Sequence, residues 1–500
     1  MMCQVVEEYE ESLEQEAPSV SKQCVKCKEV LAVVVIRAGD KYCRDCFDQY
    51  FRHKFRATLG KNRIIFPGER VLLAVSGGPS SSSMLRQVQE GFGQSAHKKL
   101  RFTPGIVYVD EGGAVGQSVE ERRLTVAKME DVFKATGFPF HILPLEQLLD
   151  IPTSVVAVRA VRAASSPPPA SAYKAAVDDF IRNGVSSDVT PQEKAGTPPP
   201  YVLASQTHAL RQMMDSVKTL TAREDLMSTL RQQLLVHTAR SEGYTKVMLG
   251  HNCTRLAVQL LTSISLGRGA HLARDTGFSD SRYGDVTFVR PMRDHTAKEI
   301  AYHNRLFHVQ CVFTPNLHTK AKAKSSIQHL TESFVNNLQV DFPSTVSTIY
   351  RTSEKLQTAC KNSSSEDHGD KCLLCMCSLD TSGEMASAFQ ATLISERLSQ
   401  AKSADANGPL PGENPGRSGP QTGSCCRGPG QRCVEDGGCS PALRPPDTLD
   451  VRPWLCYSCQ LTVKDMSSVD VLPGCILSEA RRRQTRSRMR EEISDFLLDD

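Results

Sequence analysis

Three short, mainly apolar runs predict buried strands: Val71–Val75, Ile106–Val109 and Lys246–Leu249. Each run ends in a turn rich in glycine or polar residues, and segments with helical patterning lie between the runs. Strand, helix and strand in this order are typical of a doubly wound parallel sheet. We therefore predict an α/β fold, and we expect ligands to bind at the carboxyl ends of these strands.

Helical periodicity and breaker residues predict the elements around this sheet. We expect one long helix over about 205–240 and a basic helix over about 48–60. The segment 163–200 carries two runs of three prolines, so we predict a surface insertion with one short helix around Tyr173–Ile181. Near the amino terminus, the apolar run Leu31–Ile36 predicts a strand that folds back on the chain.

The composition excludes several classes of protein. Of the 500 residues, 40% are hydrophobic and 23% charged, which is ordinary for a globular protein and excludes a wholly disordered chain, a collagen or a coiled-coil rod. No run of about 18 apolar residues occurs, so we expect no membrane-spanning helix. The first 16 residues hold six Glu and no Lys or Arg, which fits neither a secretory signal nor a mitochondrial presequence. A cytosolic or nuclear protein is the default expectation.

The net charge of +4 does not indicate a partner, but the charge is unevenly placed. Residues 50–70 hold six Lys or Arg against one acid, and residues 481–490 hold six Arg. Such patches can neutralise the phosphates of a nucleic acid. For the second block, we favour the alternative of a solvated helix face, because five acids follow directly and could pair with these arginines.

The amino-terminal cysteines have the spacing of a metal site. Cys24 and Cys27 form one C-x-x-C pair, and Cys43 and Cys46 form another. Each pair lets two thiolates from one tight turn reach a single ion, and disulfides are rare in the reducing cytosol. Four thiolates in a tetrahedron make a closed, structural zinc site. The alternative, four unrelated buried cysteines, is much less favoured.

The carboxyl-terminal cysteines repeat this pattern over a longer distance. Cys372 and Cys375 form one pair, and Cys456 and Cys459 form the other. The stretch 400–450 between them is rich in Gly, Pro, Ser and Arg, so we predict a disordered insertion. Because loop-closure entropy grows slowly with length, we expect the two pairs to share one zinc ion. The insertion holds further cysteines, whose chemistry the spacing leaves open: Cys425, Cys426, Cys433 and Cys439.

These patterns divide the chain into segments. We predict an acidic disordered tail (1–20), a zinc module (21–50), an α/β domain (51–360) with the insertion 163–200, a second zinc module (370–380 plus 454–462), the disordered insertion 400–450 and a carboxyl-terminal helix (476–500).

A glycine- and serine-rich loop follows the first predicted strand. It comprises Ser76, Gly77, Gly78, Pro79 and the four serines 80–83, and a helical pattern follows it. Glycines at such a junction let backbone N–H groups approach a phosphate, and the beginning of the helix adds positive potential. No GK[ST] follows, so this is not a Walker A loop. The alternative is a serine-rich cap on an ordinary helix.

Several segments together resemble the tRNA-thiolating branch of the N-type ATP pyrophosphatases. Residues 76–81 (SGGPSS) are similar to the family's SGGxDS pyrophosphate loop, residues 109–112 (VDEG) to its strand-end DEG segment, residues 250–257 (GHNCTRLA) to its GHNxDDxA segment, and residues 289–315 (with RPM, KEI and CVFTP) to its RPL…KEI…CxxxP region. Zinc modules at both ends also belong to that branch. The resemblance covers about 24–60, 70–112, 245–355 and the carboxyl-terminal cysteine pairs.

The resemblance implies a fold, a reaction and partners. Members of the branch adenylate C2 of the wobble uridine (U34) in tRNAs for Lys, Glu and Gln with ATP. A sulfur carried as a thiocarboxylate on a ubiquitin-related modifier then replaces the oxygen. This chain is most similar to the partner subunit, which implies a cytoplasmic heterodimer with a catalytic paralogue. Zinc would be structural, and ATP with Mg²⁺ would bind at the partner subunit.

Departures from the family pattern argue against catalysis by this chain alone. The Asp of the loop, a Mg²⁺ ligand, is replaced by Ser80, and the two Asp of GHNxDDxA are replaced by Thr254 and Arg255. Thiolating members use two active-site cysteines. Cys311 stands at the second position, but no cysteine occurs between Cys46 and Cys253, so the first is missing. Cys311 is therefore only a weak catalytic candidate, with an ordinary buried thiol as the favoured alternative.

The resemblance also implies binding residues. The candidates for a vestigial nucleotide pocket are Ser76, Gly77, Gly78, Ser81, Asp110, His251 and Asn252. His251 and Asn252 could equally form a strand-end turn that hydrogen-bonds its own backbone, and Asp110 could cap a helix. The candidates for contact with tRNA phosphates are Lys54, Arg56, Lys61 and Arg63 on the predicted basic helix.

We therefore predict a non-catalytic subunit of a tRNA thiolation complex that dimerises with the active paralogue and helps to bind tRNA. A second hypothesis is an autonomous adenylating thiouridylase, against which Ser80, Thr254, Arg255 and the missing cysteine argue. A third is a zinc adaptor for protein partners. It leaves the strand–loop–helix unit unexplained, and ATP binding by the isolated chain would separate it from the other two.

Overall fold

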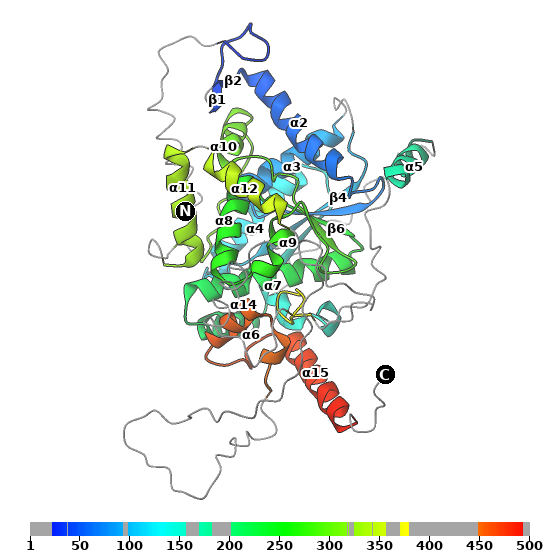
Figure 1. The fold of residues 1–500 in the computed structure, drawn as a ribbon, viewed down its shortest axis with the longest axis vertical. Coiled ribbons are helices and arrows are strands. Elements are labelled where there is room, and N and C mark those ends of the chain that lie inside the picture. The colour runs from blue at the N-terminus through cyan, green and yellow to red at the C-terminus, as the bar shows by residue number, and fades with distance from the viewer. Residues whose placement is uncertain are drawn as a thin grey trace, which may run out of the picture.

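A computed structural model of the chain describes residues 23–37, 39–93, 99–156, 170–182, 202–317, 319, 325–342, 344–356, 371–379 and 449–493 (Figure 1). The cysteines expected in the insertion 400–450, the acidic tail 1–20 and Asp495, Asp499 and Asp500 lie outside these residues. None of the described helices is long and apolar enough to cross a membrane.

The centre of the molecule is a six-stranded sheet. Its strand order is β5 (Phe140–Pro144), β4 (Thr103–Asp110), β3 (Arg70–Ala74), β6 (Lys246–Leu249), β8 (Thr287–Val289) and β7 (Ser279–Asp280). Neighbouring strands from β5 to β8 are parallel, and β7 pairs with β8 in antiparallel fashion. The predicted α/β fold with a mostly parallel sheet is confirmed, and so are the three predicted strands. The strands β5, β7 and β8 were not predicted.

The sheet separates two hydrophobic cores, because successive strand residues point to opposite faces. Val71 and Leu73 of β3 pack into one core with side chains from the helices α2 (Arg44–Asn62), α3 (Pro79–Phe92) and α4 (Val119–Lys134). Leu72 packs into the other core with α6 (Ala204–Ser216) and α7 (Leu220–Ser241). Both faces are therefore covered by helices, which explains why the strands are apolar throughout.

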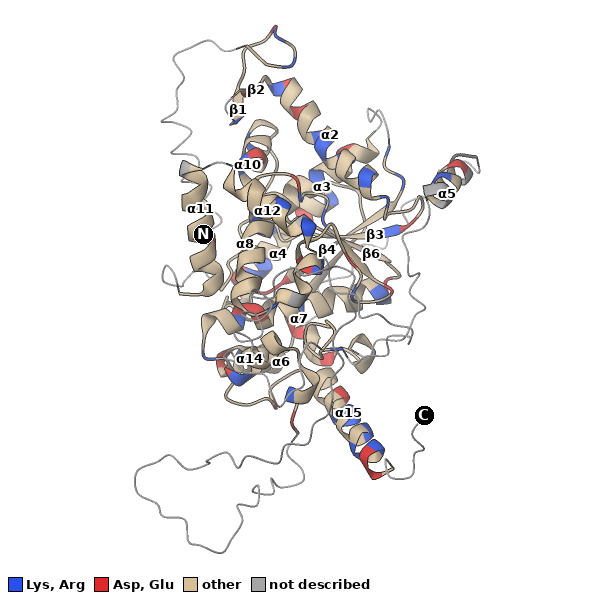
Figure 2. Cartoon of the chain, in the orientation of Figure 1, with Lys and Arg blue, Asp and Glu red and all other residues tan. Residues whose placement is uncertain are grey.

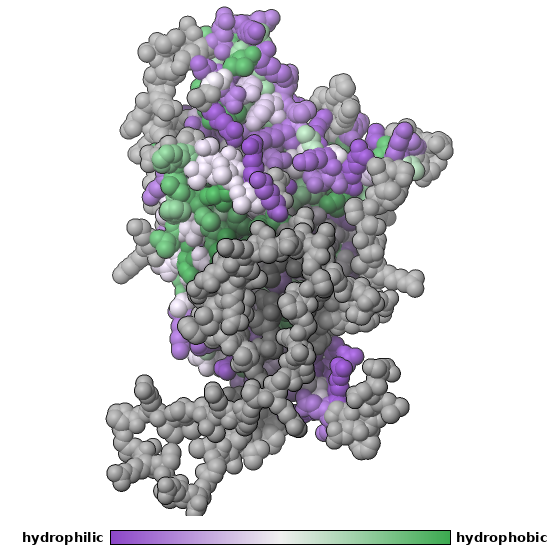
Figure 3. Space-filling model, viewed as in Figure 1, coloured by the Kyte–Doolittle hydropathy of each residue, from purple (hydrophilic) through white to green (hydrophobic). Residues whose placement is uncertain are grey.

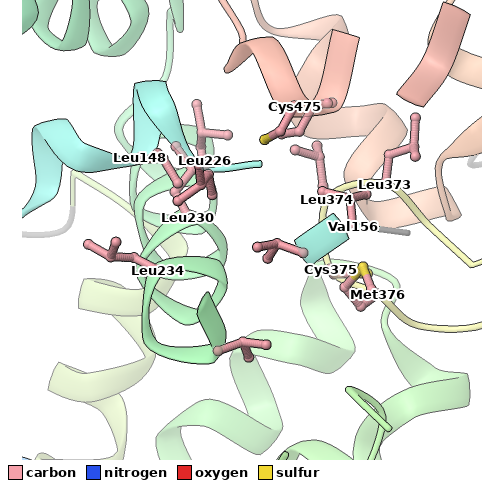
Figure 4. Packing of buried hydrophobic residues seen from close by; sticks show 14 of the residues in the cluster. Leu148, Val156, Leu226, Leu230, Leu234, Leu373, Leu374, Cys375, Met376 and Cys475 are labelled. Atoms are coloured by element: carbon pink, nitrogen blue, oxygen red, sulfur yellow. The ribbon is translucent and has the colours of Figure 1, made fainter. Parts of the chain in front are cut away.

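The carboxyl-terminal segments belong to the second core. The loop 372–377 packs against α7 and α15 (Gly474–Glu492), and Figure 4 shows Leu373, Leu374 and Cys375 close to Leu230 and Leu234. The amide of Gln233 on α7 donates to the carbonyls of Leu373 and Leu374 at 3.1 and 2.7 Å. The helix α14 (Tyr457–Lys464) completes this region.

A third layer lies outside the sheet. The helix α8 (Cys253–Ser265) follows β6 and packs against α11 (Ile327–Asp341) and α12 (Thr345–Lys355). The helix α10 (Ala297–Leu306) packs against α2 and α3. At the amino terminus, β1 (Val34–Arg37) and β2 (Asp40–Tyr42) form a small hairpin.

Two helix predictions differ from the structure in their bounds. The single long helix predicted over 205–240 is wrong, because the chain leaves the helical conformation at Val217. Val217 forms a β-bridge with Met466, and the side chain of Thr219 accepts a hydrogen bond from the N–H of Ala222 to begin α7. The short helix predicted around Tyr173–Ile181 is present as α5 (Ala170–Arg182).

Candidate functional site

A cavity of about 850 Å³ lies where the strands β3, β4 and β6 end. Its lining comes from the loop Ser76–Ser81, from Glu111 and Gly112 after β4, from His251 and Arg255 after β6, and from Arg231 of α7. The segment Cys311–Asn316 forms part of the wall. The cavity is therefore at the sheet edge where ligands were expected.

The loop Ser76–Ser81 presents backbone rather than side chains. Gly77 has φ of +82°, and a Cβ there would lie 2.7 Å from the carbonyl oxygen of Val312, so a larger residue would be strained and crowded. Gly78 precedes α3, and no side chain caps this helix. The first N–H groups of a helix lack partners within it. Those at the beginning of α3 can therefore donate to an anion in the cavity.

The loop serines are occupied by local hydrogen bonds. Ser81 accepts from the N–H of Ser76 at 3.2 Å and donates to the carbonyl of Gly78 at 3.0 Å. Ser80, which stands at the Asp position of the family loop, is buried and accepts from the amide of Asn252 at 2.8 Å. The Ser80 hydroxyl is thus part of the packing between α3 and α8.

Asn252 has a structural place in this arrangement. Its side-chain oxygen accepts from the N–H of Arg255 at 2.8 Å and caps α8. The preceding Gly250 allows close packing, since a Cβ there would lie 2.7 Å from the Cα of Ser81. Asn252 does not line the cavity. Asn252 therefore fits the alternative given above, in which its side chain hydrogen-bonds the backbone of its own turn.

The acids after β4 are paired with arginines. Asp110 accepts from Arg122 at 2.8 Å and from the N–H of Gly112 at 2.9 Å, and it neither lines the cavity nor caps α4, which begins after Ser118. Glu111 does line the cavity, and both of its oxygens accept from the guanidinium of Arg231. Neither carboxylate is left free for a cation.

The cavity does not fit a divalent cation. Among the described residues that line it, Glu111 is the one carboxylate, and it already neutralises Arg231. The hydroxyl of Ser80 and the guanidinium of Arg255 stand where the family resemblance implies acids, and proteins usually hold Mg²⁺ through one or two carboxylates. Positive charge in the cavity comes from arginine instead.

His251 adds a neutral group to this lining. Burial, together with Arg255, Arg290 and Arg231, holds the pKa of His251 well below its usual value, so the imidazole is uncharged at pH 7. Its Nδ1 atom is buried and has no hydrogen-bond partner among the described residues. A ligand in the cavity could supply that partner.

The two internal cysteines have different surroundings. Cys311 lines the cavity and is exposed, so the expectation of a buried thiol is wrong for it. No second cysteine lines the cavity among the described residues. Cys253 is buried between α8 and its neighbouring helices, and burial raises the pKa of its thiol to about 12.

The four amino-terminal cysteines come together as predicted from their spacing. The sulfurs of Cys24, Cys27, Cys43 and Cys46 all lie within 4.8 Å of one another, and those of Cys27 and Cys43 are 3.9 Å apart. Tetrahedral zinc with bonds of about 2.3 Å places sulfurs about 3.8 Å apart. Burial raises the pKa of Cys24, but surrounding backbone N–H groups outweigh it and lower the pKa to about 6. This group could hold a metal ion.

The second group forms although its halves are far apart in the sequence. The sulfurs of Cys372, Cys375, Cys456 and Cys459 all lie within 4.8 Å of one another, and all four residues are buried. The residue after each first pair has the same left-handed backbone, with φ of 61° at both Lys28 and Met376. Cys377 lies outside the group and accepts from the guanidinium of Arg282 at 2.9 Å.

The predicted phosphate-contacting residues divide into two kinds. The ammonium of Lys54 is 2.7 Å from the buried carboxylate of Glu299, and that carboxylate also accepts from Tyr50. Lys54 therefore joins α2 to α10. Lys61 and Arg63 are exposed at the end of α2, Arg56 is half-buried, and Arg63 lies over the ring of Tyr173.

Sequence patterns did not indicate Arg231 or its partnership with Glu111. Arg231 lies in the middle of a long helix, 120 positions from Glu111, and no local motif surrounds it. The sequence indicates only that Arg231 lies on a helix beside the sheet, and many other residues lie there too.

Comparisons with known proteins identify a family. The family model described as cytoplasmic tRNA 2-thiolation protein 2 matches residues 326–461. Proteins of that name from Danio rerio and Homo sapiens are each 50% identical to this chain, covering 100% of it and 99% and 98% of their own lengths. The solved U34-tRNA thiolase NcsA of Methanococcus maripaludis, with its 4Fe–4S cluster, aligns with 69% of this chain and 91% of its own, at 15% identity and a TM-score of 0.45.

Proposed function

This chain belongs to the cytoplasmic tRNA 2-thiolation protein 2 family, and we therefore propose that it takes part in the 2-thiolation of tRNA in the cytoplasm. Its substrate is the wobble uridine of tRNAs for Lys, Glu and Gln. Sulfur comes from a thiocarboxylated ubiquitin-related modifier, and ATP activates the uridine.

Within this reaction, we propose that the chain is a non-catalytic subunit that works with a catalytic paralogue. The carrying observation is the ion pair between Glu111 and Arg231, which neutralises the one carboxylate among the described lining residues. Without a free carboxylate the cavity lacks a site for Mg²⁺, and Cys311 lacks a second thiol. Adenylation and sulfur transfer then occur at the paralogue.

The cavity itself supports a residual role in binding an anion. The residues at the beginning of α3 and Arg255 all line it. Ser76, Gly77, Gly78, Ser81 and His251 form or line this pocket. Asp110 and Asn252 contribute by holding the surrounding turns.

An exposed apolar surface supports the heterodimer. Leu330 and Phe334 are one turn apart on α11, and each is at least half exposed; Ile264 of α8 is exposed as well. Figure 3 shows apolar side chains gathered over α11 and α12. Contiguous apolar surface of this kind marks contact with a protein partner. We assign this surface to the paralogue.

The basic end of α2 supports contact with tRNA. Arg56, Lys61 and Arg63 remain for phosphate contacts, whereas Lys54 is held by Glu299. The two groups of four cysteines are proposed to hold structural zinc, with all four positions filled by thiolates and no open position for chemistry.

Single-turnover thiolation tests this assignment. The purified chain, the paralogue and their mixture would each receive tRNA, ATP and the thiocarboxylated modifier. We expect 2-thiouridine from the mixture, none from this chain alone, and no change in the mixture when this chain carries Ser80→Ala. Product from this chain alone, abolished by Ser80→Ala, would establish an autonomous enzyme instead.

A further inference from the structure

The helix α15 continues far beyond the part that packs on the protein. Its buried residues are confined to the first half: Cys475, Ile476, Glu479, Ala480 and Arg483. Residues 484–492 add about 14 Å of helix at 1.5 Å per residue. Nearly all of them are exposed, and Figures 1 and 2 show this half projecting from the body of the molecule.

Two of the six arginines in this helix pair with an acid of the same helix. Glu479 binds Arg482 at 2.7 Å and Arg483 at 3.0 Å. Arg483 also donates to the carbonyl of Lys371 at 2.6 Å and lies over the ring of Trp454. The contacts of Arg483 with Lys371 and Trp454 attach the first half of α15 to the segments that precede the second group of cysteines.

The other arginines are placed differently. Arg481, Arg486 and Arg490 are exposed, and no ion pair is described for any of them among residues 449–493. Glu491, which lies in the same half of the helix, accepts from the hydroxyl of Ser487 at 3.2 Å. The alternative of a face neutralised by the acids that follow stays a prediction, because Asp495, Asp499 and Asp500 lie outside the described residues.

Packing does not explain an exposed helix of this composition. Arg482, Arg486 and Arg490 follow one another at intervals of four, so they share a face, and like charges at this spacing destabilise a helix. No apolar stripe compensates, since Met489 is the one large apolar side chain between Gln484 and Glu492 and is itself exposed. A polyanion laid along this face would remove the repulsion.

We propose that the outer half of α15, residues 484–492 together with Arg481, is an RNA-binding arm whose arginines contact phosphates. The proposal rests on the proposed function, in which tRNA is the polyanion that the protein binds. Arginine matches phosphate oxygens with two parallel hydrogen bonds. A membrane surface or an apolar groove would require an apolar face, which the arm lacks.

The arm is far from the other basic surface. In Figure 2, α2 and α15 lie at opposite ends of the molecule, with the sheet between them. The arm therefore contacts a different part of the tRNA from Arg56, Lys61 and Arg63. One extended RNA held at two ends would be positioned across the molecule.

Salt-dependent binding tests the arm. The full-length chain and the triple variant Arg481→Gln, Arg486→Gln, Arg490→Gln would be titrated with tRNA at several salt concentrations. Three lost phosphate contacts lower the slope of log K against log salt by about two to three, and weaken binding by roughly tenfold to a hundredfold at low salt. The charge-retaining triple Arg→Lys variant should keep most of the slope.

A matched control changes three exposed cations on another helix. Arg123, Lys128 and Lys134 of α4 are exposed, and their triple Gln variant should bind as the wild type does. Circular dichroism would establish that both variants fold.

The outcomes separate the two proposals. If the wild type binds tRNA and the α15 variant keeps the full salt slope, the assignment of RNA binding to α15 is wrong. The proposed function still stands in that case. If the α15 variant keeps the slope but loses association with the paralogue, the arm is a protein-docking element and the RNA assignment is overturned. If neither the wild type nor its complex with the paralogue binds tRNA, the proposed function fails first.

Discussion

At the scale of single residues, the ion pair between Glu111 and Arg231 controls the charge inside the cavity. Each partner cancels the other, and Arg255 remains as a nearby cation. Because both side chains are only partly exposed, removing one charge changes what the other can attract. This pair decides whether the pocket prefers an anion or a cation.

We expect Glu111→Gln to strengthen binding of inorganic pyrophosphate, because Arg231 is then released to bind the anion. A charge-assisted hydrogen bond gained at a part-buried site corresponds to roughly a tenfold lower Kd. Calorimetric titration without divalent cations would measure it, and Arg231→Gln should change the affinity in the opposite direction. An unchanged Kd in both variants would show that the anion binds elsewhere.

Buried histidines give the protein a pH dependence of their own. Burial lowers the pKa of His303 to about 4, and its imidazole is stacked on Phe51 at 4.0 Å. An unfolded histidine has a pKa of about 6.5, so the unfolded state binds the proton first as the pH falls. The contribution of His303 to the free energy of unfolding is therefore fully present above pH 6.5. It is lost as the pH falls from about 6.5 to 4.

We expect His303→Gln to make the loss of stability with falling pH shallower, by up to about 1.4 kcal/mol per pH unit in this window. Urea unfolding at pH 7, 6 and 5 would measure the difference. His308→Gln is the control, because that side chain is exposed. Parallel pH profiles for His303→Gln and the wild type would contradict the assignment.

The residues of the site show what a sequence can and cannot indicate. Ser76–Ser81 follow a strand directly, so their place at the cavity was predictable from local order. The family resemblance implies Asn252 as a pocket residue, but its amide group donates to Ser80 and its side-chain oxygen caps α8. Side-chain direction and pairing across 120 positions, as for Glu111 and Arg231, depend on packing that no local pattern records.

At the scale of elements, α2 depends on its contact with α10. Burial raises the pKa of Glu299, but the ammonium of Lys54 and other partners outweigh it, and the net pKa is lowered. The carboxylate therefore stays ionised in a buried position. It needs Lys54 for that, since an unpaired buried charge is costly.

We expect Lys54→Met to destabilise the protein by roughly 2–4 kcal/mol, because Glu299 loses its counter-ion. Urea denaturation would measure it, with Arg56→Gln as a control that changes stability by less than about 0.5 kcal/mol. For tRNA affinity we expect the opposite ranking of the two variants: Arg56→Gln should weaken binding more than Lys54→Met does. A stable Lys54→Met variant with weakened tRNA binding would restore Lys54 to the RNA-contacting set.

The break between α6 and α7 marks a limit of periodicity. Helical patterning continues through 205–240, so one helix was predicted. Tertiary contacts decided otherwise, since Val217 bridges to Met466 near the other end of the chain and the N–H of Thr219 donates to Asp465. The strands β7 and β8 are two and three residues long, which is too short for a pattern to stand out.

At the scale of the whole molecule, the two cysteine groups have unequal roles in stability. Cys459 belongs to the large core beneath the sheet, whereas Cys24 lies in a small cluster of its own. Loss of a bound ion at the second group therefore disturbs the core. Loss at the first would disturb only the amino-terminal hairpin and the beginning of α2, which carries Cys46.

We expect Cys459→Ser to lower the main unfolding transition by several degrees and Cys24→Ser to leave it nearly unchanged, because a serine hydroxyl is a poor replacement for a zinc thiolate. Scanning calorimetry would record the transition, and native mass spectrometry should find one zinc fewer in each variant. Equal shifts in the two variants would contradict the difference in roles.

The apolar surface on α11 gives a prediction for assembly. Phe334→Asp should weaken the heterodimer with the paralogue by tenfold or more, because a charge in an apolar contact is left without a partner. Light scattering of the mixed subunits would measure it. Val119→Asp on α4 is the control, since Val119 is also exposed. Equal weakening by both variants would show that the partner binds another surface.

The second cysteine group also fixes the geometry of the chain between its halves. Cys375 and Cys456 are 81 positions apart, yet their sulfurs are 3.5 Å apart. The two sides of the cysteine group between which this stretch of sequence runs therefore lie next to each other. Doubling the length of this stretch adds only about 0.6 kcal/mol of closure entropy. It is therefore a natural place to splice in a reporter domain without shifting α15 relative to the sheet.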